Sequence, residues 1–354
     1  MKKTDIKSLY LSELEQKLGD MGEKRFRAGQ VYQWLHQKQV KDFGEMSNLS
    51  LSLREKLADH FTLTVLVLAD VKISRIDGTR KYLFRLMDGN VIESVWMQYH
   101  HGSSVCISSQ VGCRMGCRFC ASTLDGLERN LTAAEMLEQI YRIQELTGER
   151  VSHIVIMGSG EPFDNYEEVI RFLRLVSDAQ GLHISPRNIT VSTCGIVPGI
   201  LRFAKEGLPV TLALSLHAPN DRVRQTLMPV AKSYSLSEVL NACREYFEKT
   251  GRRITFEYSL VKGVNDNPAE ARMLAGLLKD MHGHVNLIPV NPVKERNYVR
   301  SDRRAIQEFK AILEKSGIAV TIRREMGRDI QGACGQLRRS YLTGESEDHE
   351  KEGG

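Results

Sequence analysis

The spacing of hydrophobic positions divides the chain into two parts. In the first 95 residues, apolar residues at helical spacing are followed by β-rich stretches with a turn at Asp88-Gly89-Asn90. These elements predict a small N-terminal α+β accessory domain over 1–95. The predicted helices cover 11–18 and 27–38, and the β-rich stretches cover 62–77 and 79–98.

From about residue 100, short apolar runs alternate with amphipathic stretches. This order predicts a parallel sheet with helical crossovers, and runs that are apolar throughout are typical of strands covered on both faces. We expect chemistry at the carboxyl ends of such strands. Three helix starts have capping-box spacing, at Thr132 with Glu135, Asn165 with Glu168, and Ser235 with Glu238. The predicted strands are 105–108, 153–158, 188–193, 210–216, 254–261, 284–290 and 319–324.

Composition narrows the class of protein. The chain has 354 residues, of which 42% are hydrophobic, so it can bury a core without disulfide support. No apolar run is long enough to span a membrane, and the N-terminus lacks the apolar segment of a secretory signal. The seven cysteines are clustered, which in a reducing compartment favours metal binding or catalysis. The sequence therefore predicts a cytoplasmic protein with no membrane partner.

Charge is unevenly distributed along the chain. The net charge is +5, but residues 343–354 carry five acids and one lysine, which leaves +9 on the other 342 residues. A basic body with an acidic, disordered tail over 343–354 predicts a polyanionic partner such as RNA or DNA, and the alternative is a merely basic protein. Basic residues at 24–27 near Tyr32 and Trp34 suit RNA contact, or else form an ordinary helix with core aromatics.

Cys113, Cys117 and Cys120 form the sharpest motif, with the spacing C-x3-C-x2-C directly after a predicted strand. Three thiolates on one loop can hold a soft metal centre, and Gly116 lets the loop fold closely around it. A four-iron cube needs four ligands, so three cysteines leave one iron open to another molecule. The alternatives are a zinc site that lacks a distant ligand, or thiols that bind no metal.

This spacing resembles the signature of the radical S-adenosylmethionine (SAM) superfamily. The resemblance implies a partial (βα)6 TIM-like barrel over 96–342, within an α/β fold, that holds a [4Fe-4S] cluster whose open iron is chelated by the amine and carboxylate of SAM. The segment Gly158-Ser159-Gly160-Glu161-Pro162 resembles the GGEP motif of the superfamily. There Gly160 allows close approach of the backbone, and Glu161 can accept a hydrogen bond from the SAM ammonium.

A second pair of cysteines narrows the family. Cys334 lies between Gly332 and Gly335, downstream of Arg323, Arg324 and Arg328, which suits a nucleophilic thiol on a loop, although a buried filler is the alternative. The chain resembles the RlmN/Cfr family of RNA adenine methyltransferases. The segments that carry the resemblance are SVCISSQVGCRMGCRFCAST (104–123), GSGEP (158–162), STCGIVP (192–198), LALSLHAPND (212–221), LMPV (227–230), GVND (263–266), HVNLIPVNP (284–292) and ACGQLR (333–338).

The resemblance implies a mechanism that consumes two SAM molecules per turnover. Cys334 is methylated by the first, and the second is cleaved at the cluster to a radical that activates this methyl group. The carbon then adds to adenine as a covalent protein–RNA adduct. Cys106 matches the cysteine that resolves the adduct through a transient Cys106–Cys334 disulfide, which reductant must reopen. Glu93 matches a family proton acceptor, and the sequence leaves open whether Glu93 or Cys106 takes the ring proton.

The family's SAM-contacting positions also carry over. They match Gly160, Glu161, Ser192, Ser215, Leu216, His217 and Asn291. Two departures are Ser159, where many relatives have Met, and Cys194, where a small residue without a thiol is common. Cys243 lies within a predicted helix and is expected to be a core residue.

The resemblance implies methylation of C2 of adenosine 2503 in 23S rRNA, protein-free or in an early assembly intermediate, and of adenosine 37 in some tRNAs. Segments near the N-terminus and around the cysteine motif resemble RlmN-type members more than Cfr-type ones, which methylate C8 of the same rRNA adenosine. Two further alternatives are a non-catalytic RNA-binding or ribosome-assembly protein with a structural cluster, and a different radical SAM enzyme such as a glycyl-radical activase. The Cys106/Cys334 pair argues against both. The expected partners include a flavodoxin- or ferredoxin-type electron donor, and the chain is expected to be a monomer.

Overall fold

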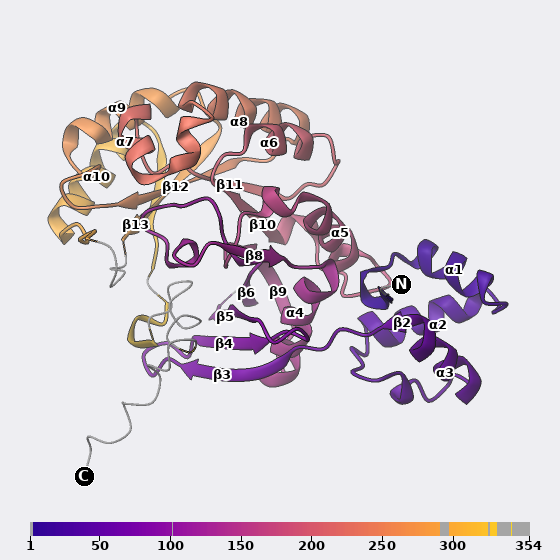
Figure 1. Ribbon diagram of the computed structural model, residues 1–354. Helices are drawn as coiled ribbons and strands as arrows, with labels where there is room; N and C mark the ends of the chain where they lie inside the picture. Colours follow the sequence, from indigo (N-terminus) through magenta and orange to yellow (C-terminus); the bar gives the residue numbers. More distant parts are fainter. Residues whose placement is uncertain (1–2, 101, 291–296, 325, 331–340, 342–354) are drawn as a thin grey trace, which may run out of the picture.

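A ten-stranded mixed sheet forms the centre of the molecule (Figure 1). The computed structural model describes residues 3–100, 102–290, 297–324, 326–330 and 341. The strand order is β14-β13-β12-β11-β10-β9-β6-β5-β4-β3. Its parallel strands are β6 (Gly102–Ile107), β9 (Val151–Ile156), β10 (Ile189–Thr193), β11 (Thr211–Ser215), β12 (Ile254–Leu260), β13 (Gly283–Pro289) and β14 (Ala319–Ile322). All seven strands predicted after residue 100 are confirmed.

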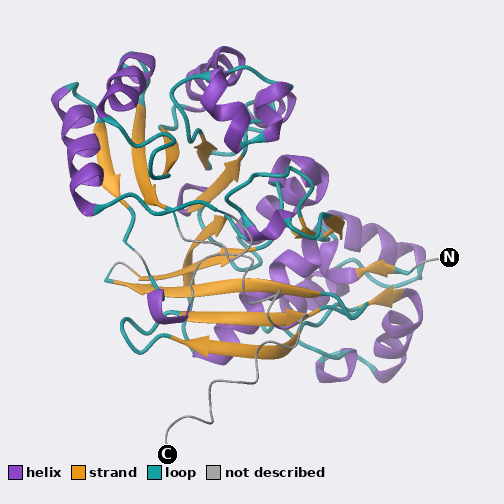
Figure 2. Cartoon of the chain, turned by 60° about the vertical axis from the view of Figure 1, so that its left-hand side comes forward, coloured by secondary structure: helices purple, strands orange, loops and turns teal. Residues whose placement is uncertain are grey.

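The parallel strands form an arc with helices along its outer side (Figure 2). On β10, Ile189 and Val191 are buried, whereas Thr190 and Ser192 between them are only half-buried. This strand is therefore covered on its outer face and faces a hollow on its inner face, and the expectation that both faces are covered does not hold for it. Within the described residues, no helix combines the length and apolar character needed to cross a membrane. The helices of this part are α4 (Ala133–Thr147), α5 (Tyr166–Ser177), α6 (Val197–Phe203), α7 (Asp221–Leu227), α8 (Leu236–Thr250), α9 (Pro268–Leu278) and α10 (Arg303–Lys315).

Three antiparallel strands extend the same sheet beyond β6. They are β3 (Val67–Ile73), β4 (Arg80–Arg85) and β5 (Val91–Tyr99). The turn predicted at Asp88-Gly89-Asn90 joins β4 to β5, and Gly89 has the positive φ of +90° that such a turn requires. Because β5 pairs directly with β6, residues 67–99 continue the core sheet. The domain boundary expected at residue 95 falls within β5 and stays a prediction.

The first 62 residues form a helical group at one end of the molecule, beside α4 and α5 (Figure 1). Both helices expected here are confirmed, and a third, over 51–60, was not predicted. Tyr32 is buried and donates a hydrogen bond to Asp178 (3.0 Å), so it belongs to the core and cannot stack on RNA, whereas Phe26 is exposed. The elements are β1 (Thr4–Asp5), α1 (Leu11–Asp20), α2 (Phe26–His36), α3 (Leu51–His60) and β2 (Phe61–Thr62).

Two of the three predicted capping boxes are confirmed. Thr132 with Glu135 caps α4, and Ser235 with Glu238 caps α8. The box expected at Asn165 is wrong, although α5 begins at the next residue. The Asn165 amide donates instead to two loop carbonyls, those of Ser109 and Leu131, and Glu168 accepts from the backbone N–H of Ala133 at the start of α4. Both side chains therefore bond to other segments of the chain and do not form a capping box at α5.

A buried ion pair joins the leading segment to the core. Lys7 Nζ contacts Glu138 of α4, with both side chains 0% exposed, and also donates to the Thr64 carbonyl (3.0 Å). Glu138 additionally accepts from the backbone N–H of Leu66. Arg142 Nε lies 3.5 Å from the other Glu138 oxygen, so removing Lys7 leaves the buried carboxylate with only this longer ion contact.

We therefore expect Lys7→Met to lower the free energy of unfolding by about 3 kcal/mol. Guanidinium denaturation followed by circular dichroism measures the change. The control is Lys41→Met, which removes a pair with Glu145 whose side chains are 46% and 45% exposed. That change should cost less than about 1 kcal/mol, because water screens exposed pairs. Equal losses in the two variants would contradict the expectation.

Candidate active site

The cysteine motif lies on a loop bracketed by a short antiparallel pair, β7 (Gln110–Gly112) and β8 (Leu127–Asn130). The backbone N–H of Cys113 donates to the Gly126 carbonyl (2.8 Å). Inside the loop, Thr123 Oγ1 donates to the carbonyls of Cys117 (3.1 Å) and Cys120 (3.0 Å). The loop conformation is thus fixed by the chain's own hydrogen bonds.

All three cysteines line one cavity of about 260 Å³. The carboxyl ends of β9, β10 and β11 contribute to the same cavity, as expected for a parallel sheet. Its lining includes five of the positions matched to SAM contacts, namely Gly160, Glu161, Ser192, Ser215 and His217. Leu216 is buried and does not line it. Asn291 and Cys334 lie outside the described residues.

The glycine motif passes close to the cysteine loop. A Cβ on Gly160 would lie 2.7 Å from both Ser109 Oγ and Gln110 Cβ, and the residue has a φ of +112°, so only glycine fits without strain. Ser159 Oγ lies 3.0 Å from Ser122 Oγ, just beyond the last cysteine. The departure at Ser159 therefore adds a hydrogen bond between motif and loop that a methionine could not make.

Glu161 presents a buried carboxyl group to the cavity. One oxygen accepts from the backbone N–H of Phe163 (3.0 Å) and the other from that of Cys194 (2.7 Å). Burial nevertheless raises the pKa of Glu161 above its usual value, although these hydrogen bonds oppose the shift. A cationic ligand in the cavity would offset the burial, so the site favours a positively charged group here.

His217 follows β11 in a strained backbone conformation, with a φ of +55°. Its Nδ1 accepts from the backbone N–H of Ser259 (2.9 Å), and Phe119 of the cysteine loop packs edge-on against its ring at 4.7 Å. Burial lowers the pKa of His217 to about 3, so the ring is neutral. Because Nδ1 accepts, Nε2 carries the proton and is a hydrogen-bond donor.

Arg224 is a buried cation behind the cysteine loop that sequence reasoning missed. It donates to the backbone carbonyls of Cys194 (2.7 Å) and Leu216 (3.2 Å), and its side chain is inaccessible to solvent. Within the described part of the chain, its Nη1 has no hydrogen-bond partner. Burial lowers its pKa, and the thiols of Cys194 and Cys117 oppose this. From the sequence alone, Arg224 cannot be distinguished from an exposed charge on an amphipathic helix.

The residues fit an iron–sulfur cluster bound to SAM. Burial raises the pKa of the Cys113 thiol to about 12 and that of the Cys117 and Cys120 thiols above the usual value, and metal ligation is what would make them thiolates. The buried guanidinium of Arg224 would balance the resulting negative charge. Among the described residues, no three His, Cys, Asp or Glu side chains converge as they would on a single metal ion.

Glu93 and Cys106 lie on neighbouring strands of the same sheet, outside the cavity lining. Cys106 is buried with Val95 and Met97 of β5. Burial raises the pKa of the Cys106 thiol, and the positive charge of Arg323, which lines the cavity, opposes the shift. Glu93 is also buried and pairs with Lys81 of β4 at 3.2 Å, a partner that the sequence did not reveal.

The two remaining described cysteines differ in their surroundings. Cys194 is buried beside Cys117 and lines the cavity, and burial raises its pKa well above the usual value. Cys243 is buried in α8 and does not line the cavity, as expected for a core residue. Neither thiol is exposed to solvent on the outer surface.

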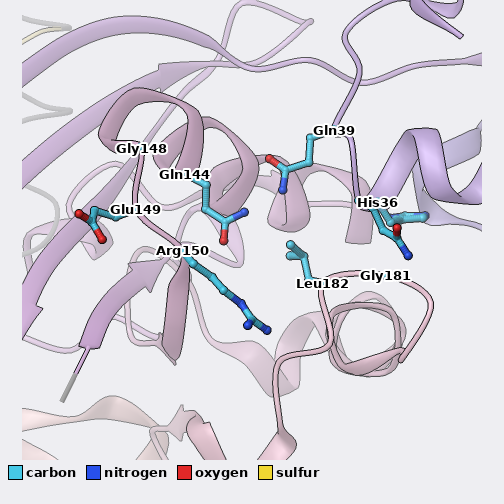
Figure 3. A pocket seen from close by; sticks show the side chains of 9 residues that line it. His36, Gln39, Gln144, Gly148, Glu149, Arg150, Gly181 and Leu182 are labelled. Carbon is cyan, nitrogen blue, oxygen red and sulfur yellow. The ribbon is translucent and has the colours of Figure 1, made fainter. Parts of the chain in front are cut away.

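A second hollow of about 320 Å³ lies away from the cysteines. Figure 3 shows Gln39, Gln144 and Arg150 among the side chains around it. Arg150 directly precedes β9, so this hollow lies at the amino ends of the strands, opposite the edge that carries the thiols. It is therefore separate from the candidate active site.

The chain is similar to known proteins over nearly its whole length. Residues 107–274 match the radical SAM superfamily, and residues 4–63 match the ribosomal RNA large subunit methyltransferase N-terminal domain. The chain is 63% identical over 339 residues to the probable dual-specificity RNA methyltransferase RlmN of Lachnoclostridium phytofermentans, covering 96% of this chain and 95% of that protein. It is 60% identical to the protein of the same name from Lachnospira eligens, covering 96% and 97%. The crystal structure of a radical SAM methyltransferase from Sphaerobacter thermophilus is similar, with a TM-score of 0.89 and 44% identity, covering 94% of this chain and 98% of that one.

Proposed function

The chain belongs to the RlmN family of radical SAM RNA methyltransferases, and from this premise we propose that it methylates C2 of adenosine 2503 in 23S rRNA and of adenosine 37 in some tRNAs. One observation carries the proposal. The three cysteines of the motif share a cavity with Glu161 and His217 at the carboxyl ends of the strands. This arrangement supports a cluster beside a bound SAM, which the family implies.

The cavity offers complementary groups for SAM. The Glu161 carboxylate suits the ammonium group, and the Nε2–H of His217 suits an acceptor. Ser192 and Ser215 offer hydroxyl groups at the ends of β10 and β11. When bound, the cluster and SAM supply the radical that activates the methyl group on Cys334.

The chain's own residues perform the rest of the proposed reaction. The Cys334 sulfur carries the one-carbon unit to the adenine ring and becomes covalently linked to RNA. A base then removes the ring proton, and the one electron left over from the radical passes to an oxidised carrier of the flavodoxin or ferredoxin type. The Cys106 thiol loses its proton and attacks the Cys334 sulfur. The bond from that sulfur to the methylene carbon breaks, and this carbon keeps the electron pair and takes up a proton to become the methyl group of the product. This leaves a Cys106–Cys334 disulfide, so each turnover requires a reductant. Two SAM molecules are consumed, one for the methyl group and one for the radical.

Glu93 is the better candidate for the base. Burial raises the pKa of the Cys106 thiol, so that thiol holds its own proton at neutral pH. Glu93 is buried with Oε2 3.2 Å from Lys81 Nζ, and this ion pair holds its carboxylate in place near Cys106. The structure thus supports Glu93 as proton acceptor and Cys106 as the resolving thiol.

RNA is the substrate class of the family, and the leading segment is proposed to bind it. The match of residues 4–63 to a ribosomal RNA methyltransferase N-terminal domain supports this role. Phe26 is exposed, with the Arg27 guanidinium 4.9 Å from its ring centre, which suits contact with bases and phosphates. A flavodoxin- or ferredoxin-type donor, a monomeric state and action in the cytoplasm stay predictions.

Replacing Cys334 tests the proposed function. We expect Cys334→Ala to abolish RNA methylation while the cluster is retained, because the variant lacks only the methyl carrier. Mass spectrometry of nucleosides from RNA incubated with each protein detects 2-methyladenosine, and iron analysis reports the cluster. Unchanged methylation by Cys334→Ala would overturn the proposal. A product that is 8-methyladenosine would favour the Cfr-type alternative.

A further inference from the structure

Three buried polar side chains share one face of β4, β5 and β6, which lie side by side (Figure 1). In the antiparallel registers, Lys81 lies opposite Val95, and Val95 lies opposite Cys106. Glu93 is two residues before Val95 on β5, so its side chain leaves the sheet on the same face. Lys81, Glu93 and Cys106 therefore form a compact group.

Lys81 and Glu93 are joined as an ion pair without access to solvent. Lys81 Nζ lies 3.2 Å from Glu93 Oε2, and the two side chains are 0% and 1% exposed. Both charges act on the neighbouring thiol, since Glu93 raises the pKa of Cys106 and Lys81 lowers it. The pair is thus part of the electrostatic environment of the proposed resolving cysteine.

Stability alone gives little reason for a lysine at this position. A buried ion pair can often be replaced by apolar residues of similar volume without loss of stability, and Val95 and Met97 on the same face are apolar. A function for the pair follows from its geometry. The 3.2 Å contact with Lys81 Nζ fixes the direction of the Glu93 carboxyl group on a face of the sheet where Val95 and Met97 offer it no other polar partner.

Building on the proposed function, we propose that Lys81 is a positioning residue whose buried side chain pairs with the Glu93 carboxylate and orients it to remove the adenine ring proton. In that step the ring C–H bond breaks, its electron pair stays with the purine, and the proton moves to a Glu93 oxygen. Lys81 itself touches neither the substrate nor a cofactor in this scheme.

The test compares Lys81→Met, Lys81→Arg and Glu93→Gln with the full-length wild-type protein, all with reconstituted clusters. General base catalysis contributes about 10²- to 10⁴-fold, so we expect Lys81→Met to lower the rate of RNA methylation at least about 100-fold. A protein–RNA adduct should accumulate on denaturing gels, because the adduct forms but is not deprotonated. Lys81→Arg keeps the charge and should retain turnover within about tenfold of wild type.

Lys72→Met is the matched control. Lys72 lies directly opposite Lys81 in the register of β3 and β4, on the same face, but its side chain is 43% exposed and pairs with Asp70. This variant should turn over as wild type does. The double variant Lys81→Met with Glu93→Gln should be no slower than either single variant, because both changes disable one step.

Methylation of Cys334 and iron content show that each variant is folded, and Lys81→Gln replaces Lys81→Met if methionine prevents folding. A merely structural lysine would lower Cys334 methylation together with turnover and would trap no adduct, which would overturn the inference. Normal turnover by Lys81→Met would overturn it as well. If the wild-type protein itself methylates neither Cys334 nor RNA, the proposed function fails, which is a distinct result.

Discussion

Replacing Cys117 with alanine is expected to remove the iron–sulfur cluster and all detectable RNA methylation. Cys117 is 8% exposed and packs against Cys194, Leu227 and Met228, so the substitution leaves a gap and an incomplete ligand set. Two remaining cysteines cannot hold a cluster whose fourth position is already given to SAM. Iron and sulfide analysis of anaerobically reconstituted protein measures the loss, and nucleoside mass spectrometry measures methylation.

The comparison for Cys117→Ala is Cys243→Ala. Cys243 is fully buried in α8, and its loss should cost about 1–2 kcal/mol of stability by leaving a small cavity. Iron content and methylation should be unchanged, which separates ligand loss from general damage to the fold. A Cys117→Ala protein with a full complement of iron would show that this residue is not a cluster ligand.

The Cys106→Ala variant should stop after forming a covalent bond to RNA, whereas the wild-type enzyme completes many turnovers. The variant keeps the cluster loop and the cavity, so the steps up to adduct formation remain possible. Without the resolving sulfur, the bond between Cys334 and the adenine carbon cannot be exchanged for a disulfide. We expect an RNA band of retarded mobility on a denaturing gel that protease digestion removes, with at most one adduct per enzyme.

Burial of Cys106 would keep this thiol from reacting before the protein–RNA adduct has formed. Burial raises its pKa, so it is protonated and unreactive toward solvent oxidants until the adduct forms beside it. Wild-type enzyme that is given its electron donor but no thiol reductant should stop after one turnover, whereas it should continue when a thiol reductant is also supplied. Multiple turnovers by Cys106→Ala would contradict the assignment.

Local patterns in the sequence were sufficient for the elements and the cysteine loop. Short apolar runs predicted the parallel strands because each is buried under helices on its outer face, and the spacing of Cys113, Cys117 and Cys120 is itself the signal for their loop. Thr132 and Ser235 cap their helices as predicted because a capping box is closed within four residues.

Features that depend on distant contacts were missed. Asn165 is of a residue type that often caps helices, but its side chain donates to the backbone carbonyls of Ser109 and Leu131 in other segments. Lys81 and Arg224 read as ordinary surface charges, because burial of a lysine or arginine depends on which strand or loop packs over it. The continuation of the sheet through β3, β4 and β5 was likewise hidden, since the pairing of β5 with β6 is not encoded in either strand alone.

The position of β6 limits how this protein can be divided. It is hydrogen-bonded antiparallel to β5 on one side and parallel to β9 on the other, so it joins the antiparallel and parallel parts of the sheet. A fragment cut at residue 107 would lack both Cys106 and Glu93 and would leave β9 with a bare edge open to aggregation. A foreign RNA-binding domain should therefore be joined between β2 and β3, at residues 63–66, so that β3, β4 and β5 stay with the catalytic part. Glu138 would have to be replaced in such a fusion, because its buried partner Lys7 is removed with the leading segment.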